Sequence, residues 1–388
     1  MAFATIDVTK GITGVLPSAN ATYTSLRKNS KPLMINGDMQ IAQRSTSVSG
    51  LTSSGAIQTV DRIKNEIGNI GTYTVAQESL SSGEAYNNGF RKAWRIDTTT
   101  ADASPSAGDS LYVTYHFEGQ DLQLFKKGTS NAEKFTLAFW IKSNKTGTGQ
   151  VNLRDNDNSR LIGGTYTISS ADTWEHKVVN FASDTTGAFD NDNAGSMDIE
   201  WWLDSGTTYS SGTTPTSWEA FSQADRNASG NLQIARNTAN DWSITGIQLE
   251  VGEFTSSTLP PFQFESFGDN LKRCQRYYYK LKNDSGSATG AYWGNSIVDS
   301  STTLKGTIRF PKMRTVPSAF ETTGTASDYR VWTSGNTSTV CSSVPTLDQI
   351  TSFSGRLLFT VSSGLTAGQV GGYRSSTTDA YLAWSAEL

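Results

Sequence analysis

The sequence predicts an all-β protein with an N-terminal extended arm, a jelly-roll β-sandwich and a smaller C-terminal antiparallel β-sandwich. Three observations favour this class. Hydrophobic residues make up only 36% of the 388 residues, and 35 residues are Gly, which suits sheets with one solvated face better than thick helical cores. Many short runs alternate between apolar and polar residues, as β-strands do. Clusters of Gly, Ser, Thr and Pro separate these runs as turns.

Length and charge narrow the class of protein further. A chain of 388 residues is too long for one ordinary domain, so two globular units and a terminal extension are expected. The net charge of −4 argues against a nucleic-acid partner, which usually meets a basic surface. The sequence contains no long apolar stretch that would predict membrane insertion, and the N-terminus lacks the features of a secretory signal.

Residues 1–32 are predicted to be an arm without a core of its own. Gly, Pro and Asn recur at short intervals, and no helical or strand period persists. Such a segment becomes ordered only by lying on a neighbour or by pairing with copies of itself. A floppy leader and an attachment arm both fit these residues.

Residues 33–265 are predicted to form the jelly roll. In residues 135–142 every second side chain is large and apolar, and residues 197–203 repeat the pattern. This alternation directs one face of each strand toward a core. Further strand-like runs are residues 111–117, 174–181 and 242–250, and short helices are expected near residues 121–125 and 218–223.

Residues 266–388 are predicted to form the second sandwich, because Pro260 and Pro261 break any regular element just before them. A short helix is expected across residues 267–276, with Asp269 as its cap. The strand-like runs that follow are residues 277–281, 304–310, 329–333, 357–361 and 381–384.

Three segments carry a family resemblance. The first is residues 35–44, INGDMQIAQR, followed by Val60-Asp61-Arg62; the second is residues 244–252, ITGIQLEVG, followed by residues 262–265; the third is residues 271–278, LKRCQRYY. Together they resemble a family of bacteriophage tail-fibre and related virion proteins, in which a jelly roll similar to carbohydrate-binding modules precedes a small C-terminal β domain.

The resemblance implies a function as well as a fold. It implies a homotrimer held on the virion by its N-terminal arm, through a tail adaptor, a nozzle or another virion protein. The C-terminal domain would then face the host and recognise a cell-surface polysaccharide or outer-membrane receptor. The protein would be made in the host cytoplasm and located in the tail fibre of the virion.

Few residues are available for catalysis. The chain has two histidines, His116 and His176, both within strand-like runs, and two cysteines, which we expect to be buried reduced thiols. Paired carboxylates for glycan hydrolysis remain an option, since Asp198 and Glu200 would share one strand face. A solvated strand face explains the same two residues, and we expect no enzyme.

No cofactor is expected, with a structural Ca²⁺ as the one candidate. Residues 190–195, DNDNAG, resemble the start of a calcium loop, but Trp201 stands where the loop would need Glu. The candidate ligands are therefore Asp190 and Asp192 in this loop, and Asp38 and Asp241 by analogy with jelly-roll modules.

Aromatic side chains are the candidates for saccharide contact, because flat rings pack against the C–H faces of pyranoses. Trp140 and Trp202 lie opposite the apolar faces of their strands, so exposure, a second packing layer or a trimer interface would each fit. Those of the C-terminal domain lie among Gly-, Ser- and Thr-rich segments: Tyr292, Trp293, Tyr329, Trp332 and Tyr373.

Three hypotheses therefore stand. The first is a trimeric host-recognition fibre, the second a structural virion protein such as a head decoration or tail spacer, and the third a glycan depolymerase. The residues alone support a modular β surface protein. The expectation that it belongs to a phage particle comes from the family resemblance.

Overall fold

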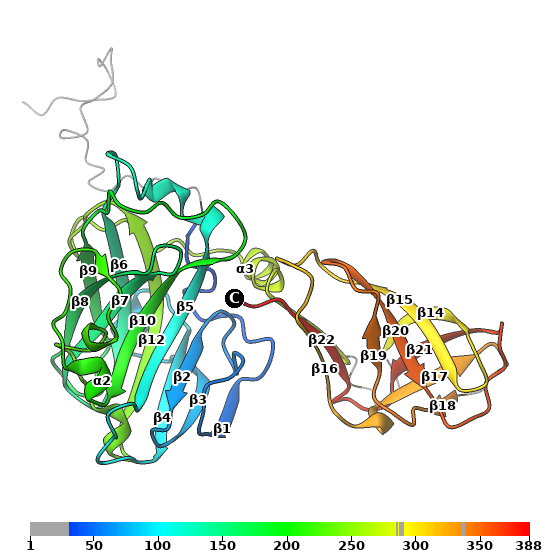
Figure 1. Ribbon diagram of the computed structural model, residues 1–388. Helices are drawn as coiled ribbons and strands as arrows, with labels where there is room; N and C mark the ends of the chain where they lie inside the picture. Colours follow the sequence, from blue (N-terminus) through cyan, green and yellow to red (C-terminus); the bar gives the residue numbers. More distant parts are fainter. Residues whose placement is uncertain (1–30, 285, 287–290, 336–337) are drawn as a thin grey trace, which may run out of the picture.

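The computed structural model describes residues 31–284, 286, 291–335 and 338–388. Two β-sandwiches stand side by side, and the C-terminal end of the chain lies between them (Figure 1). The prediction of an all-β protein with two antiparallel sandwiches is confirmed. The arm predicted for residues 1–32 lies outside the described residues apart from Lys31 and Pro32.

The first sandwich consists of two six-stranded antiparallel sheets. In spatial order, sheet A contains β1 (Ser47–Leu51), β3 (Thr72–Ser79), β4 (Lys92–Thr100), β12 (Asp241–Val251), β6 (Phe135–Lys142) and β9 (Glu175–Phe181). Sheet B contains β11 (Glu219–Ala220), β8 (Arg160–Ile168), β7 (Gly147–Asp155), β10 (Gly195–Ser205), β5 (Ser110–Glu118) and β2 (Lys64–Gly68). Neighbouring strands in each sheet are mostly distant in sequence, because the chain crosses repeatedly from one sheet to the other.

The core of this sandwich lies where the alternating patterns directed it. The apolar residues of β6 and β10 face the interior and are fully buried: Phe135, Leu137, Phe139 and Ile141 on β6, and Met197, Ile199, Trp201 and Leu203 on β10. The opposite face of β10 is buried as well, because Arg226 of the segment 206–231 lies on Glu200 and Trp202, and Asp198 is hydrogen-bonded to His116 and Asn156. This burial overturns the expectation of a solvated carboxylate face.

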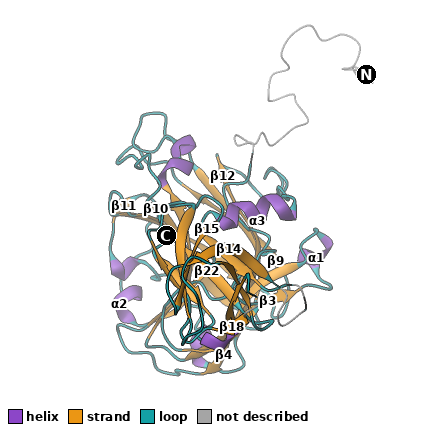
Figure 2. Ribbon diagram, turned by 90° about the vertical axis from the view of Figure 1, so that its right-hand side faces the viewer, coloured by secondary structure: helices purple, strands orange, loops and turns teal. Residues whose placement is uncertain are grey.

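Helices are short and lie at the periphery of the β layers (Figure 2). They are α1 (Glu84–Asn87), α2 (Thr207–Ser210) and α3 (Phe267–Gln275), with 3₁₀ turns η2 (Gly119–Asp121), η3 (Gln123–Phe125), η4 (Gln223–Asp225), η5 (Ile234–Arg236) and η6 (Ala326–Asp328). The helical turns expected near residues 121–125 are confirmed. The helix expected at residues 218–223 is wrong, because Glu219 and Ala220 pair with β8 as an edge strand.

Helix α3 follows the double proline and leads into the second sandwich. Its N-cap is Ser266, whose hydroxyl oxygen accepts a hydrogen bond from the backbone N–H of Asp269 at 3.2 Å. The expectation that Asp269 caps the helix is therefore wrong in detail: Asp269 accepts a hydrogen bond from the Ser266 hydroxyl at 2.7 Å. Its carboxylate lies in the first turn, where the helix dipole favours a negative charge.

The second sandwich packs a three-stranded sheet against a seven-stranded one. Sheet C contains β13 (Tyr278–Lys282), β22 (Tyr381–Ser385) and β16 (Ala319–Thr322). Sheet D contains β18 (Ser338–Val340), β17 (Tyr329–Thr333), β21 (Val370–Ser375), β14 (Tyr292–Val298), β15 (Thr303–Arg309), β20 (Ser354–Thr360) and β19 (Thr346–Asp348). Leu382 and Trp384 of sheet C meet Leu304, Val331 and Phe359 of sheet D in one core. Cys274 and Cys341 are both free and buried, as expected.

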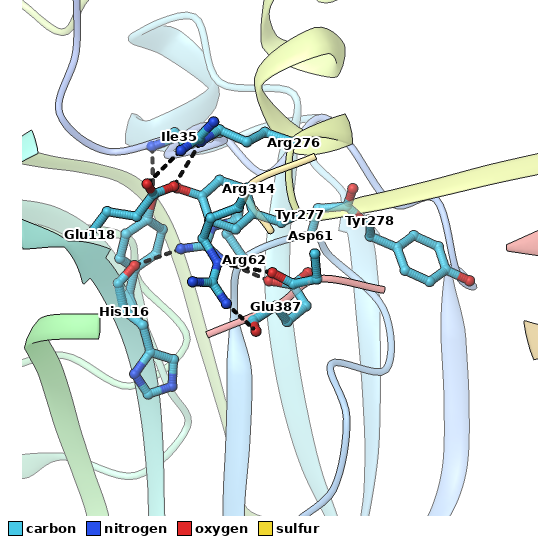
Figure 3. A network of polar contacts seen from close by, with 12 residues as sticks. Ile35, Asp61, Arg62, His116, Glu118, Arg276, Tyr277, Tyr278, Arg314 and Glu387 are labelled. Atoms are coloured by element: carbon cyan, nitrogen blue, oxygen red, sulfur yellow. Dashed lines mark hydrogen bonds and ion pairs between the residues drawn. The ribbon is translucent and has the colours of Figure 1, made fainter. Parts of the chain in front are cut away.

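A polar network joins the two sandwiches (Figure 3). Arg62 donates to Glu387 and to the backbone oxygen of His116, each at 2.6 Å, and its guanidinium lies 3.5 Å from the ring centre of Tyr277. Glu118 accepts two hydrogen bonds from Arg276, at 2.8 and 2.6 Å. Burial would raise the pKa of Glu118, but these bonds and that of Tyr277 hold the pKa below its usual range.

The three segments that carry the family resemblance meet at this junction. Gly37 of the first segment accepts from the backbone N–H of Ile247 in the second at 2.9 Å. A Cβ on Gly37 would lie 2.2 Å from the Ile247 oxygen, so only Gly fits there. Asn270, just before the third segment, accepts from the backbone N–H of Asn36 at 3.1 Å. The first and third resemblance segments therefore lie at the joint between the sandwiches, and the second packs against the first.

Candidate binding surfaces

The outer face of sheet D brings together two of the predicted aromatic residues. Antiparallel pairing aligns Val340, Arg330, Arg374 and Tyr292 across β18, β17, β21 and β14. The next row contains Ser338, Trp332, Gly372 and Asn295. Directly paired residues point to the same side of a sheet, so these two rows form one surface, which we call the distal face.

Gly372 allows the Trp332 indole to lie across the sheet. A Cβ on Gly372 would stand 2.4 Å from the indole nitrogen of Trp332, so any larger residue would displace the ring. Tyr292 is 59% exposed, and its ring centre lies 6.1 Å from that of Trp332 at an angle of 79°. The two rings are thus held edge to face on a partly exposed face of sheet D.

Two arginines flank these rings. Arg374 donates to the hydroxyls of Tyr292 and Ser338, each at 2.9 Å, and its guanidinium lies 5.2 Å from the Tyr292 ring centre. Arg330 donates to the same Ser338 hydroxyl at 3.3 Å. The distal face therefore combines apolar ring surface with donors held in fixed positions, which is the chemistry that a saccharide needs.

The other three aromatic candidates of this domain do not reach the distal face. Tyr329 and Tyr373 are fully buried, with their side chains on the inner side of sheet D. Trp293 packs against the same core, 6.0 Å from Tyr329. A register shift between Tyr292 and Gly294 accompanies this inward turn. The prediction that Tyr329 and Tyr373 are available for contact is wrong, because strand alternation directs them inward.

Trp140 lines a cleft of about 340 Å³ on the outer side of sheet A. The Trp140 ring lies 4.9 Å from that of His176, and Phe90, Phe262 and Phe264 complete the aromatic lining. Burial, together with the charge of Lys177, holds the pKa of His176 below its usual value, so the imidazole is neutral at pH 7. We call this hollow the jelly-roll cleft.

A glycine in the second resemblance segment makes room for this cleft. Gly246 has φ of +60°, and a Cβ there would stand 2.6 Å from Phe90 and 2.9 Å from Trp140. The pairing of β12 with β6 shifts register across this position, between Thr245 and Gln248. The bulge thus gives Phe90 and Trp140 the space in which they pack.

Trp202 is not exposed, so it is unavailable for the saccharide contact for which it was a candidate. It is fully buried, stacked on Tyr112 at 4.5 Å between ring centres. The guanidinium of Arg226, from the covering segment 206–231, lies 4.5 Å from the Trp202 ring. Trp202 therefore belongs to a second packing layer, which was one of the three alternatives that the sequence left open for it.

The carboxylates considered for hydrolysis are already held by hydrogen-bonded partners. Glu200 accepts from Arg226 at 3.0 and 2.7 Å. Asp198 pairs with His116 at 2.5 Å and accepts from Asn156 at 2.9 Å. Burial would raise the pKa of Asp198, but these partners hold it below its usual range. A general acid needs a raised pKa, so Asp198 is unsuited to that role.

The calcium candidates are not brought together. Asp38 accepts from Asn270, whereas Asp241 pairs with Arg95 at 2.8 Å. The Asp192 carboxylate accepts from the backbone N–H of Ala194, and the Asp190 backbone N–H donates to Asp157. Within the described residues, no group of three or more His, Cys, Asp or Glu side chains is arranged to hold a metal ion.

Sequence patterns missed several residues of both surfaces. Arg330, Arg374 and Ser338 belong to no motif, although strand alternation with Trp332 places Arg330 on the same face. In the sequence, Phe262 and Phe264 stand out only as part of the second resemblance segment, and His176 only as a strand residue. Their grouping depends on the return of the chain past β12, for which the sequence holds no local signal.

Comparisons with known proteins give only distant likenesses. No family model matches the chain, and no curated protein matches it. The enzymatically active domain of tailspike protein 4 from bacteriophage CBA120 aligns with 57% of this chain and 21% of its own, at 11% identity and a TM-score of 0.28. A putative sugar-binding protein from Bacteroides thetaiotaomicron aligns with 57% of this chain and 100% of its own, at 13% identity and a TM-score of 0.29.

A third solved structure, TmCBM61 in complex with β-1,4-galactotriose, aligns with 57% of this chain and 99% of its own, at 8% identity and a TM-score of 0.26. Similarities at this level do not transfer a ligand. None of the helices in the described part of the chain is long and apolar enough to cross a membrane.

Proposed function

We propose that the protein is a non-enzymatic fibre subunit of a bacteriophage virion that binds saccharides of the host surface through the distal face. The observation that carries this proposal is the exposed Tyr292 ring beside a Trp332 indole that lies against Gly372. Rings in fixed positions on a partly exposed sheet face lose little entropy when a sugar stacks on them.

The resemblance of the three junction segments supports the virion assignment. In this proposal the chain forms a homotrimer, residues 1–32 attach it to a tail adaptor or another virion protein, and the C-terminal sandwich faces the host. The polar junction supports such an arrangement, because it fixes the distal face relative to the jelly roll. Three copies of a shallow site raise avidity through effective concentration.

The jelly-roll cleft is the second candidate contact. It offers Trp140 and Phe264 as ring surfaces, and Phe264 is 49% exposed. Its volume of about 340 Å³ falls at the lower end of the range for ligand pockets. A monosaccharide or a short glycan end fits these dimensions.

Binding to an array of bacterial capsular and lipopolysaccharide glycans tests the proposal. The double variant Tyr292→Ala/Trp332→Ala is expected to lose binding at least tenfold. Phe353→Ala is the matched control, because Phe353 is a ring of the same domain, 48% exposed, outside the distal face. Trp140→Ala reports separately on the jelly-roll cleft.

Full binding by the double variant would exclude the distal face as the contact surface. Light scattering tests the trimer, and electron microscopy of antibody-labelled particles tests the location on the virion. A location on the head or within the tail tube, combined with no glycan binding, would favour the structural virion protein instead.

A further inference from the structure

We propose that Arg330 and Arg374 form an anion-binding site, so that the saccharide recognised by the distal face is an acidic one. The shared chemistry is a negatively charged group, a uronate carboxylate or a phosphate, attached to a sugar ring that contacts Tyr292 and Trp332. This inference rests on the proposed function and adds to it the class of ligand.

The first argument is the direct pairing of two like charges. Arg330 and Arg374 are cross-strand partners on β17 and β21. Like charges directly opposite one another in a sheet are destabilising. Neither guanidinium forms an ion pair with a carboxylate anywhere in residues 31–284, 286, 291–335 and 338–388, whereas two cations on other strands of sheet D do. Lys305 pairs with Asp299 at 2.8 Å, and Arg356 with Asp348 at 2.6 Å.

The second argument is convergence. Arg374 at 2.9 Å and Arg330 at 3.3 Å both donate to the hydroxyl oxygen of Ser338. A second acceptor, the Tyr292 hydroxyl, holds the other end of the Arg374 guanidinium at 2.9 Å. A guanidinium carries five N–H donors, so donors remain on both residues after these bonds. Two cations held toward one point are set to receive an anion with little reorganisation.

The third argument is the position of the rings. Trp332 is two residues from Arg330 on the same side of β17, and Tyr292 is the cross-strand partner of Arg374. An anion between the guanidiniums therefore lies beside both rings. This juxtaposition fits a sugar that carries its charge on a substituent and presents a C–H face to the aromatic surface. An uncharged glycan would leave the repulsion between the two arginines in place.

The test compares matched ligands on the full-length protein. Polyglucuronic acid and the neutral glucan made by reducing its carboxyl groups share one backbone and differ only at C6, which is a carboxylate in the first and a hydroxymethyl group in the second. We expect the wild type to bind the acidic polymer at least tenfold more tightly, with an affinity that falls as NaCl is raised. Arg330→Gln and Arg374→Gln are each expected to remove this preference.

Arg309→Gln is the matched control, since it makes the same charge change at an exposed position at the end of β15. It is expected to stay within twofold of the wild type. Glucuronate and glucose 6-phosphate, titrated while the arginine Nε–H signals are followed by NMR, distinguish a carboxylate ligand from a phosphate ligand. Unchanged thermal unfolding temperatures of all variants exclude a folding defect.

Four outcomes decide the matter. Equal affinity for the acidic and neutral polymers, with both dependent on Tyr292 and Trp332, overturns the anion site and leaves the proposed function intact. If Arg309→Gln loses the preference for the acidic polymer as fully as the two site variants do, the protein attracts polyanions in general, and the anion site is overturned. Competition by double-stranded DNA as strong as that by the acidic polymer leads to the same conclusion. Binding of the small anions without any glycan or cell binding supports the anion site and refutes the proposed function. No binding of any ligand refutes both.

Discussion

Arg62 and Glu387, which are 325 positions apart in the sequence, form an ion pair of 2.6 Å at the junction of the two sandwiches. Arg62 is only 2% exposed. Burial by itself would lower the pKa of Arg62, but the charge of Glu387 raises it above its usual value. Because Glu387 follows the last strand of the second sandwich, this pair fastens the end of that sandwich onto the first.

Glu387→Gln is expected to destabilise the protein by about 3 kcal/mol, because it leaves a buried guanidinium without its carboxylate. Urea unfolding followed by tryptophan fluorescence measures the loss. Glu253→Gln serves as the control, since its ion pair with Lys134 is about half exposed on both sides, and a loss of only about 0.5 kcal/mol is expected there. Equal losses in the two variants would contradict this account of the junction.

Arg330→Glu is expected to stabilise the fold by about 0.5 kcal/mol, because it turns a like-charge cross-strand pair into an opposite-charge pair with Arg374. The same variant should lose affinity for acidic saccharides at least tenfold. Thermal unfolding and glycan binding, measured side by side, test the two effects. A variant that is both less stable and unchanged in binding would refute the role of the pair.

Asp38 should make stability fall as the pH rises. Burial raises its pKa from 3.8 to about 6, so between these values the unfolded state is ionised while the folded state still holds the proton. The stability contributed by the neutral form is therefore present below pH 3.8 and is lost by the time the pH passes about 6.

Asp38→Asn removes this titration while keeping an oxygen to accept from Asn270. Relative to wild type, the variant should gain about 2–3 kcal/mol between pH 4 and pH 7, measured by urea unfolding at both values. Asp348→Asn is a control of opposite sign, because the hydrogen bond from Arg356 lowers the pKa of Asp348. A difference between Asp38→Asn and wild type that does not change with pH would show that Asp38 does not titrate in this range.

Gly246→Ala is expected to cost about 2 kcal/mol, because a Cβ at φ of +60° is strained and would meet Phe90 at 2.6 Å. It should also lower the affinity of the jelly-roll cleft for any ligand, because it moves Trp140. Gly364→Ala separates the two causes: its φ is +95°, but its Cβ would meet nothing within 4 Å. If both variants lost the same stability, the contact with Phe90 would have no part in the effect.

The sequence by itself determined the elements whose signal is local. The period of two residues in residues 135–142 placed β6 at its observed limits, and Phe135 and Leu137 in the core, because alternating side chains must face opposite sides of a strand. The same rule fails for β10. Both of its faces are buried, and whether the second face of a strand meets water depends on a covering segment elsewhere in the chain.

Only the tertiary structure decided which aromatic residues can meet a ligand. Trp202 and Trp332 both lie opposite a core face, yet the segment that carries Arg226 buries Trp202, while Trp332 lies over Gly372 and stays partly exposed. The junction is equally non-local, since Arg62 and Glu387 meet only after both sandwiches have formed. Strand period sets which side a residue faces, but contacts between distant segments set what that side touches.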